Sequence, residues 1–541
     1  DVLCVGGGVA GLMATIRASE LGAKVVVAEK GNSRRSGCAR CGNDHFWSYI
    51  PEIHGPDMEL YLKDCLLTQW GALLSTVKRD MIRTWMKNSF DIVKLWDSWG
   101  IPMKYKGKWE FAGHAFPGHM PELKYSGQNQ QPILTKQALK RGAKIMNRIM
   151  VFELLGDASG VTGALGVDTR ENKLIEFQAK SVILGTGVIT RMYPGITPAL
   201  IGNHELPFTL TGDGRAIAYR LGAELLNMEM ISRHVGPRYF TRSGQATWIG
   251  VYRDSEGKPL GPYVTKPDKR YGDILPEVDK EILTRTWESG KGPVYMDCRG
   301  ISDEDLEYME YWLKHEGNTA LLDYLKEERI DVRKNPLEFM TYPITAAGKI
   351  YGNERAETSV KGLYSAGDET MAGISGAAVF GWIAGENASK FAKETPSLNI
   401  DKDRVKIKQK KDLIDELQNR KRGPDWEDAN IALQQVMYDY AGFIRSKAML
   451  QAGLNHLRRL KEKVLNTMRA KNQWELTRCL EILNLYDLGE LVFLSALERK
   501  ESRGLHRRID YPITDPLLND KLLIAKKVKG KPVFEWRERE G

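Results

Sequence analysis

The sequence predicts an α/β protein: a Rossmann-like dinucleotide-binding domain, a capping domain inserted into it, and a helical C-terminal domain. Three observations lead to this prediction. Residues 1–30 read as a strand, a glycine-rich turn, a helix and a second strand. Apolar runs that end in small residues return near 181–187 and 360–381. Between and after these returns the chain becomes rich first in Pro, Gly and aromatic residues and then in charged helical segments.

The opening segment carries the most specific motif. Its run Gly6-Gly-Gly8-Val-Ala-Gly11 follows a short apolar strand and opens an Ala-rich helix. Gly6 allows a tight turn, Gly8 lets the backbone approach a pyrophosphate, and Gly11 lets the helix pack closely on the strand. Glu29 ends the next strand, where a carboxylate can accept hydrogen bonds from an adenosine ribose. We therefore predict a dinucleotide site here.

The overall composition is that of a soluble globular protein. The 541 residues are 42% hydrophobic, the mean hydropathy is −0.40, and no apolar run has the roughly twenty residues of a membrane span. A net charge of +9 is small for this length, and the basic runs read as solvated helix faces, which argues against nucleic-acid binding. We predict a cytoplasmic protein whose membrane contact, if it has any, is made through a partner.

The six cysteines are scattered along the chain, at positions 4, 38, 41, 65, 298 and 479. They are too few and too dispersed for a disulfide framework, which favours a reducing compartment. Cys38-Ala-Arg-Cys41 has the CxxC spacing, but no second CxxC or nearby histidine completes a zinc site, and no cysteine set can hold an iron–sulfur cluster. We predict no metal site, and a redox role for this pair stays open.

The segments after the first strands predict a second cofactor surface and a helical insert. Residues 31–44 are rich in glycine and serine, so their bare backbone can wrap a cofactor. Residues 57–100 have apolar positions three and four apart, which predicts helices with tryptophans in their core. This pattern breaks around 101–132, where His114 and His119 lack the partners of a metal site.

The next stretch predicts a return to the first sheet. A helix from about Thr135 precedes apolar and alternating segments over 149–179, which predict antiparallel strands. Residues 181–184 form an apolar strand that ends in a Gly-Thr-Gly turn and is expected to join the parallel sheet. A Thr-Gly-Asp213-Gly turn then opens a helix, and Asp213 either caps this helix or touches the cofactor.

These changes divide the chain into four segments. Residues 1–233 form the first part of the dinucleotide-binding domain, with a helical insert at about 57–130. Residues 234–342 form the capping domain, and residues 343–399 return to the first domain through a strand ending in Ala-Gly-Asp. Residues 400–541 form a helical domain, whose spacing fits a three-helix unit, and a Pro-rich tail.

Seven motifs stand in an order that resembles a known superfamily. They are Gly-Gly-Gly-Val-Ala-Gly at 6, the Arg-Ser-Gly loop, Gly-Thr-Gly at 185, Thr-Gly-Asp-Gly at 211, Val-Tyr-Met-Asp at 294, Gly-Leu-Tyr-Ser-Ala-Gly-Asp at 362 and Lys-Glu-Ser-Arg-Gly-Leu-His at 500. Over nearly its whole length the chain resembles the flavoprotein subunits of succinate dehydrogenase, fumarate reductase, L-aspartate oxidase and adenylylsulfate reductase. The resemblance implies FAD, a capping domain over its isoalloxazine ring, and a hetero-oligomer in which a ferredoxin-like partner holds the iron–sulfur clusters.

The loop Arg35-Ser36-Gly37 separates the chain from part of this superfamily. The succinate and fumarate enzymes attach FAD through a histidine after the Arg-Ser pair, where this chain has Gly37, so the resemblance implies non-covalent FAD. The loop of adenylylsulfate reductase also reads Arg-Ser-Gly, and the stretches 106–111 and 233–240 are similar to that enzyme too. We therefore expect the chain to be most similar to the alpha subunit of adenylylsulfate reductase.

Several catalytic residues of the superfamily are absent. Lys280 is nearest in register to the arginine proton donor of fumarate reductase, and the stretch 342–348 replaces its second substrate histidine. Its substrate arginine has no counterpart near Ser375. His234 aligns with the histidine of the substrate pattern His-Pro-Thr-Gly. The chain thus keeps the flavin site better than either known substrate site.

The motifs give a set of cofactor-binding residues and a smaller catalytic set. The predicted cofactor-binding residues are Gly6, Gly8, Gly11, Glu29, Lys30, Ser36, Gly37, Gly42, Asn43, Thr186, Gly187, Asp213, Gly367, Asp368, Ser375 and Ala377. We predict a small anionic substrate, with Arg238 and Lys280 as candidate cations that stabilise its charge. Trp248 can stack on a planar substrate, and His234 can donate a hydrogen bond or shuttle a proton.

We therefore expect the FAD-containing catalytic subunit of an oxidoreductase, which exchanges electrons with an iron–sulfur partner and acts on a small anion. Two alternatives stay open. One is a true adenylylsulfate reductase, or a fumarate- or succinate-type enzyme, with substituted catalytic residues. The other is a non-catalytic electron-transfer subunit whose flavin turns over no small molecule. The missing residues count against the first alternative, and a closed cationic pocket counts against the second.

Overall fold

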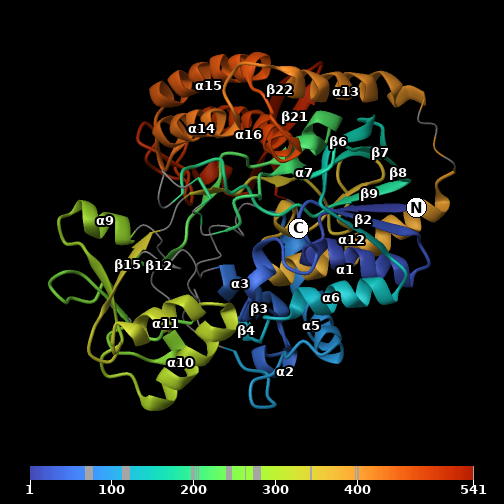
Figure 1. Cartoon of the computed structure of the whole chain (residues 1–541). Coiled ribbons are helices and arrows are strands. Elements are labelled where there is room, and N and C mark those ends of the chain that lie inside the picture. The colour runs from blue at the N-terminus through green and yellow to red at the C-terminus, as the bar shows by residue number, and fades with distance from the viewer. Residues whose placement is uncertain are drawn as a thin grey trace.

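The structure, a computed structural model, has the predicted α/β class (Figure 1). The residues that it describes are 1–66, 77–111, 122–195, 201–202, 204, 206–238, 247–261, 264–271, 282–341, 344–396, 398 and 401–539.

The first sheet of the fold has five parallel strands. In spatial order its strands are β18 (Leu363–Ser365), β9 (Ser181–Leu184), β1 (Val2–Val5), β2 (Val25–Glu29) and β5 (Lys144–Asn147). The predicted return of the chain to this sheet is confirmed at β9 and at β18. The sequence did not predict β5, because its four residues lie at an edge with both ends exposed and carry no apolar run.

Two helices rich in small residues cover one face of this sheet, α1 (Val9–Glu20) and α12 (Gly373–Glu394). They approach so closely that a Cβ on Gly381 would lie 2.4 Å from the carbonyl oxygen of Ala10. The helical insert packs beside them as α3 (Met58–Leu66), α5 (Arg79–Ser98) and α6 (Gln130–Lys140). Trp85 and Trp96 of α5 are buried in its core, as predicted. The short strands β3 (His45–Trp47) and β4 (Glu122–Lys124) pair antiparallel next to this insert.

An antiparallel sheet lies on the other side. Its strands are β6 (Ile149–Asp157), β7 (Gly160–Asp168) and β8 (Leu174–Gln178), and they confirm the prediction for 149–179. Helix α7 (Asp213–Leu221) packs on β6. Its N-cap is Gly212, a left-handed residue with no side-chain cap, so the capping role considered for Asp213 is wrong.

The described residues between 235 and 341 fold around a sheet of their own (Figure 1, lower left). Its strand order is β12 (Val235–Pro237), β15 (Leu337–Thr341), β14 (Val294–Asp297) and β13 (Val251–Arg253). The helices of this segment are α9 (Ile282–Glu288), α10 (Asp303–Glu316) and α11 (Thr319–Glu327). Where the chain enters and leaves the segment, β11 (Ile231–Ser232) pairs with β16 (Thr345–Ala346), which ties the two connections together.

Beyond residue 401 the described chain has more helices than the predicted three. They are α13 (Arg404–Asn419), α14 (Trp426–Ala441), α15 (Lys447–Thr467) and α16 (Gln473–Glu498), and they lie at the top of Figure 1. The predicted Pro-rich tail is folded at 521–538. These residues form the hairpin β21 (Lys521–Val528) and β22 (Lys531–Glu538), since Lys529 and Gly530 both adopt the positive φ of a tight hairpin turn.

The hairpin completes a second sheet with two short strands, β10 (Leu225–Leu226) and β17 (Lys349–Ile350), in the order β17-β10-β21-β22. None of the helices in the described ranges combines the length and the apolar character that crossing a bilayer requires.

Candidate cofactor and substrate site

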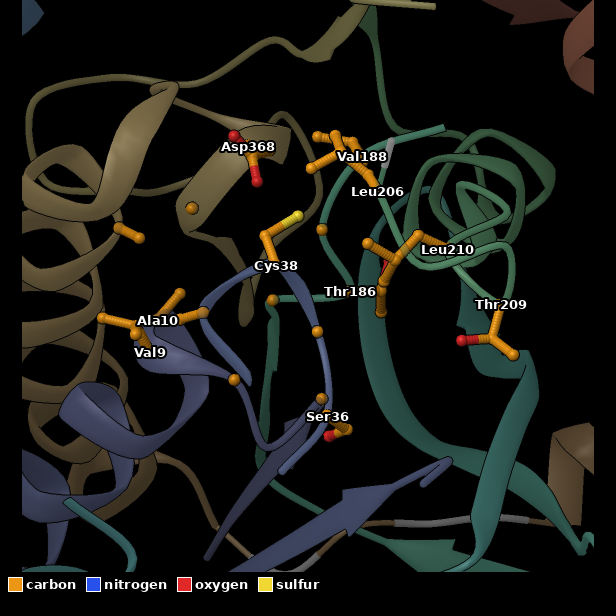
Figure 2. A pocket seen from close by; sticks show the side chains of 18 of the residues that line it. Val9, Ala10, Ser36, Cys38, Thr186, Val188, Leu206, Thr209, Leu210 and Asp368 are labelled. Carbon is orange, nitrogen blue, oxygen red and sulfur yellow. The ribbon is translucent and has the colours of Figure 1, made fainter. Parts of the chain in front are cut away.

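A cavity of about 390 Å³ opens at the carboxyl ends of the parallel strands, which is where ligands bind in open α/β sheets. Its wall includes the turns after β1, β2 and β9, the first turn of α7, and the start of α12. Figure 2 shows Ser36, Cys38 and Thr186 on this wall, with Asp368 across the opening. Residues far apart in the sequence therefore meet at one site.

The turn after β1 leaves room for a ligand at one glycine and none at two others. A Cβ on Gly6 would lie 2.3 Å from the carbonyl oxygen of Gly185, and one on Gly11 would lie 1.8 Å from the carbonyl oxygen of Gly6. A Cβ on Gly8 would meet no protein atom within 4 Å, and Gly8 lines the cavity. The backbone at Gly8 is therefore open to a group bound in the cavity.

Glu29 holds the two glycine-rich loops together. Its carboxylate accepts hydrogen bonds from the backbone N–H groups of Gly7 and Gly31, both at 2.6 Å, and from the Ser36 hydroxyl at 2.9 Å. Because Glu29 also lines the cavity, the same carboxylate is placed to accept a ribose hydroxyl.

A buried guanidinium joins three segments of the cavity wall. Arg215 of α7 donates to the carbonyl oxygens of Gly187 and Asp368, both at 2.6 Å, and of Gly348 at 2.5 Å. Lys349 lies beside it, and its Nζ is 3.4 Å from the same Asp368 carbonyl oxygen. Burial lowers the pKa of Lys349, to about 8 overall. The positive charge of Arg215 also lowers this pKa, whereas the negative charge of Asp368 raises it. Burial also raises the pKa of Asp368.

Lys30 links the cavity to the C-terminal helices. Its ammonium group contacts Asp213 at 2.6 Å and Glu481 of α16 at 2.8 Å. Glu481 also accepts from Arg191 at 2.8 Å. Burial opposes the charge of Glu481, but Arg478, Lys30 and Arg191 outweigh it and lower the pKa of this carboxyl to about 2. The carboxylate is therefore charged and fully paired at neutral pH.

A second charged cluster lies where the inserted segment meets the cavity. His45 Nδ1 is 2.8 Å from the Asp44 carboxylate, whose other oxygen binds the buried ammonium of Lys124. Burial opposes protonation of His45, but Glu122, Asp44 and Glu316 outweigh it and raise its pKa to about 9. Asp44, His45 and Glu316 each offer a ligand atom within 4.8 Å of one another. Because Lys124 already places a cation on Asp44, this geometry is better suited to holding a proton than a metal ion.

Residues 1–381 match the family described as FAD binding domain, and residues 430–538 match the one described as fumarate reductase flavoprotein C-term. The chain belongs to the FAD-binding family. FAD is accordingly its cofactor, and the open backbone at Gly8 and the carboxylate of Glu29 fit this group.

Curated relatives and solved structures extend the likeness over the whole chain. A fumarate reductase (CoM/CoB) subunit from Methanothermobacter marburgensis is 25% identical over 98% of this chain and 97% of that protein. The structure of adenylylsulfate reductase from Archaeoglobus fulgidus has a TM-score of 0.85 at 21% identity, covering 100% of this chain and 95% of that chain. The E. coli quinol fumarate reductase has a TM-score of 0.81 at 21% identity, covering 99% and 96%. The solved structures show the shared fold.

Most of the predicted cofactor-binding residues lie in the cavity wall of this FAD-binding protein. They are Gly6, Gly8, Glu29, Lys30, Ser36, Gly37, Gly42, Asn43, Thr186, Gly187, Asp213, Gly367, Asp368 and Ala377. Two lie elsewhere. Gly11 packs against Gly6, and Ser375 is buried under the indole of Trp85, whose Nε1 donates to its hydroxyl at 3.0 Å. The binding roles of these residues stay predictions.

The structure separates the predicted catalytic residues. His234 lines the cavity, whereas Arg238 pairs with Glu338 across β12 and β15, outside the cavity wall. Trp248 is 1% exposed and packs edge-on against Phe339 in the core of the inserted segment, which does not support stacking on a substrate. Lys280 lies outside the described residues, as do His114, His119 and residues 342–343.

Sequence reasoning missed the cations and the acid that complete the wall. Arg215, Lys349, His45 and Glu316 line the cavity but stand in no motif that names them. A signal was present for Arg215, because an arginine inside an otherwise apolar face of a short helix needs buried acceptors. His45 and Glu316 are 271 positions apart, so only the fold brings them together.

Proposed function

We propose that the chain is the FAD-containing catalytic subunit of an oxidoreductase that moves electrons between a small anionic substrate and an iron–sulfur partner protein. One observation carries the proposal. Glu316 from the inserted segment, and Ser232, His234 and Thr345 from its connections, line the same cavity as the glycine-rich cradle around Gly8. A molecule at that end of the cavity meets ionisable side chains next to the cofactor.

Each part of the wall has a role in this proposal. The open backbone at Gly8 and the carboxylate of Glu29 hold the dinucleotide part of FAD, with Asp368 on the opposite wall. FAD supplies the redox chemistry, since it takes up two electrons from one reactant and releases them singly to another. His45 stays protonated at neutral pH and holds a proton at the seam between the inserted segment and the cavity. The division into domains at 1–233, 234–342, 343–399 and 400–541 belongs to the same proposal.

An anionic substrate is favoured by the cations of the wall. Arg215 and Lys349 line the cavity beside His234, and positive groups at low dielectric stabilise negative charge strongly. By their names, related proteins are reductases of fumarate and adenylylsulfate or oxidases of L-aspartate, and all three compounds are anions.

An iron–sulfur partner gives the electrons a route out of the chain. The six cysteines of the sequence include no set with the spacing of cluster ligands, so the proposal places the iron–sulfur clusters on another protein. This partner makes the chain one member of a hetero-oligomer.

A fumarate- or succinate-type activity is the second candidate, favoured by the full-length likeness to a fumarate reductase subunit. The substituted substrate residues argue against it. A pure electron relay is favoured less, because a relay needs no cavity shared between a cofactor cradle and an inserted segment.

One anaerobic experiment tests the proposal. The flavin of the purified protein is reduced, and adenylylsulfate, fumarate and other small anionic acceptors are added singly while the absorbance of oxidised flavin is followed. We expect rapid reoxidation by one of them. Reoxidation by a partner protein alone would contradict the proposal and identify a relay.

A further inference from the structure

The CxxC pair of the sequence lies on the wall of the cofactor cavity. Cys38–Cys41 forms a single turn of 3-10 helix directly after Gly37. Cys38 lines the cavity, and Figure 2 shows its sulfur directed into the opening between Asp368 and Val188. Cys41, one turn further on, is exposed at the surface. The pair therefore connects the cavity wall, at Cys38, with the surface of the molecule, at Cys41.

The turn places Cys38 and Cys41 on the same side of a 3-10 helix. In a 3-10 helix the side chains of residues i and i+3 are eclipsed, and one turn rises about 6 Å along the axis. A disulfide requires Cα atoms about 4.4–6.8 Å apart. The ideal rise of such a turn thus falls within the Cα range that a disulfide spans, and no disulfide joins Cys38 to Cys41 in this structure.

Other uses of the pair find less support. In the described ranges, the only His, Cys, Asp and Glu cluster with metal-ligand spacing consists of Asp44, His45 and Glu316, and it includes neither cysteine. Three more cysteines of the described chain, at positions 4, 298 and 479, are buried in hydrophobic cores and do not line the cavity. A packing role does not fit Cys38 and Cys41, since one borders a cavity and the other is exposed.

The surroundings hold this turn in place. Gly37 has φ 75° and ψ −174°, a conformation open essentially only to glycine. At the other end, a Cβ on Gly317, just after α10, would lie 3.1 Å from the Cβ of Cys41. The backbone of the turn is therefore held between the cofactor loop and the inserted segment, while both cysteine side chains keep their χ1 rotation.

We propose that Cys38 and Cys41 form a dithiol–disulfide couple that exchanges two electrons with the flavin. On oxidation the two S–H groups lose two protons and two electrons and one S–S bond forms; the electrons pass to the oxidised flavin, and the protons pass to the flavin and to solvent. On reduction the S–S bond breaks, and reduced FAD supplies the electrons. The couple stores a second pair of electrons beside the cofactor and carries them from the cavity to the surface. The proposal rests on FAD as the cofactor and is independent of the substrate.

The linkage can be read directly from peptides, because Arg40 separates the two cysteines. The holoprotein is oxidised with glutathione disulfide, its remaining thiols are alkylated, and it is digested with trypsin. We expect the peptide 36–40 to remain joined to the peptide 41–63 until a reductant is added. Separate, fully alkylated peptides would overturn the proposal.

Counting electrons tests the exchange with the flavin. Anaerobic titration of the preoxidised holoprotein with dithionite should consume four electrons per FAD, and the two peptides should separate as the flavin becomes reduced. The variants Cys38→Ser and Cys41→Ser should each consume two electrons, whereas the control Cys298→Ser should still consume four. A wild-type protein that forms the linkage but takes up two electrons, with the peptides still joined, would refute the exchange.

The experiments distinguish a failure of the proposed enzyme activity from a failure of the proposed dithiol couple. If the Cys41→Ser variant is reoxidised by the same small anion as the wild type, the proposed enzyme activity stands whatever the electron count. If no anion reoxidises either protein, the electron count and the peptide linkage still decide the dithiol couple.

Discussion

Alanine substitutions at Gly8 and Gly11 separate cofactor binding from folding. Gly8 is the N-cap of α1 and Gly11 lies in the first turn of that helix, and an added methyl group meets different surroundings at the two positions. At Gly11 the Cβ lies 1.8 Å from the carbonyl oxygen of Gly6. Helix α1 must then move by about 1.5 Å to restore ordinary van der Waals contact. At Gly8 the methyl group meets no protein atom within 4 Å and enters the cavity.

The two variants should therefore fail in opposite ways. Gly11→Ala should lower the free energy of unfolding by about 1–3 kcal/mol, the range for overpacked interiors. Gly8→Ala should leave it unchanged or raise it by about 0.5 kcal/mol, because a residue with φ −77° accepts a side chain without strain. The same Gly8→Ala change should weaken FAD binding at least tenfold, or about 1.4 kcal/mol.

Two measurements check this pair. Denaturant unfolding of the flavin-free protein gives the stability, and quenching of flavin fluorescence on titration gives the affinity. Gly160→Ala is the matched control, since Gly160 has an ordinary φ, ordinary contacts and no place in the cavity wall. If Gly8→Ala binds FAD as tightly as the wild type, the cofactor does not pass Gly8 and the assignment of the cavity is wrong.

Four further predictions follow from the charged groups and the cofactor loop. The depressed pKa of Lys349, about 8, means that burying its charge destabilises the fold below pH 8. This cost disappears between pH 8 and 10.5, so the free energy of unfolding should rise over that range. Lys349→Met should remove the rise, and Lys361→Met, at an exposed position, should not. The raised pKa of His45, about 9, implies a fall in the free energy of unfolding as the pH rises. The protonated imidazole stabilises the fold fully below pH 6.5, and this stabilisation is lost as the pH rises through 9. Relative to His45→Gln, the wild type should therefore lose about 1–3 kcal/mol of unfolding free energy over this range. Glu481→Gln should cost about 3–5 kcal/mol in chemical denaturation, because Arg191 would keep its charge in a buried site without its carboxylate, and an unchanged midpoint would refute this account of the cluster. Acid precipitation should release all flavin into the supernatant, since Gly37 stands where an attaching histidine would be and has no side chain to bond the flavin; yellow colour kept in the pellet would show a covalent bond.

The fold was predictable wherever the sequence pattern is local. The strand, turn and helix of 1–20 depend on neighbouring residues, and the apolar runs at 181–184 and 363–365 identify themselves as buried parallel strands. The edge strand β5 and the hairpin after residue 520 were missed. Strands β5 and β22 are half exposed, so they lack the apolar signal that marks a buried strand, whereas β21 carries the buried apolar run 522–525 and was overlooked.

The candidate site was predictable where the chemistry needs glycine, and less so where it needs charge. A glycine at position 6 or 8 is explained by its own turn, so sequence alone points to it. Arg215 is explained by three carbonyl oxygens that come from 187, 348 and 368, and these meet only in the folded chain. The same reason accounts for Trp248, whose aromatic partner Phe339 is far away in the sequence.

The central position of β1 in the parallel sheet also determines when the fold can assemble during synthesis. Strand β1 is synthesised long before its neighbour β9, and the cavity wall is complete only once Arg478 of α16 has been made. Until β9 is made, an apolar strand lacks a neighbour, and such edges are exposed to aggregation during synthesis. FAD can therefore bind only after most of the chain has been synthesised. In cells short of flavin, the protein should accumulate with the part of its cavity wall that is made last lacking the contacts of the cofactor.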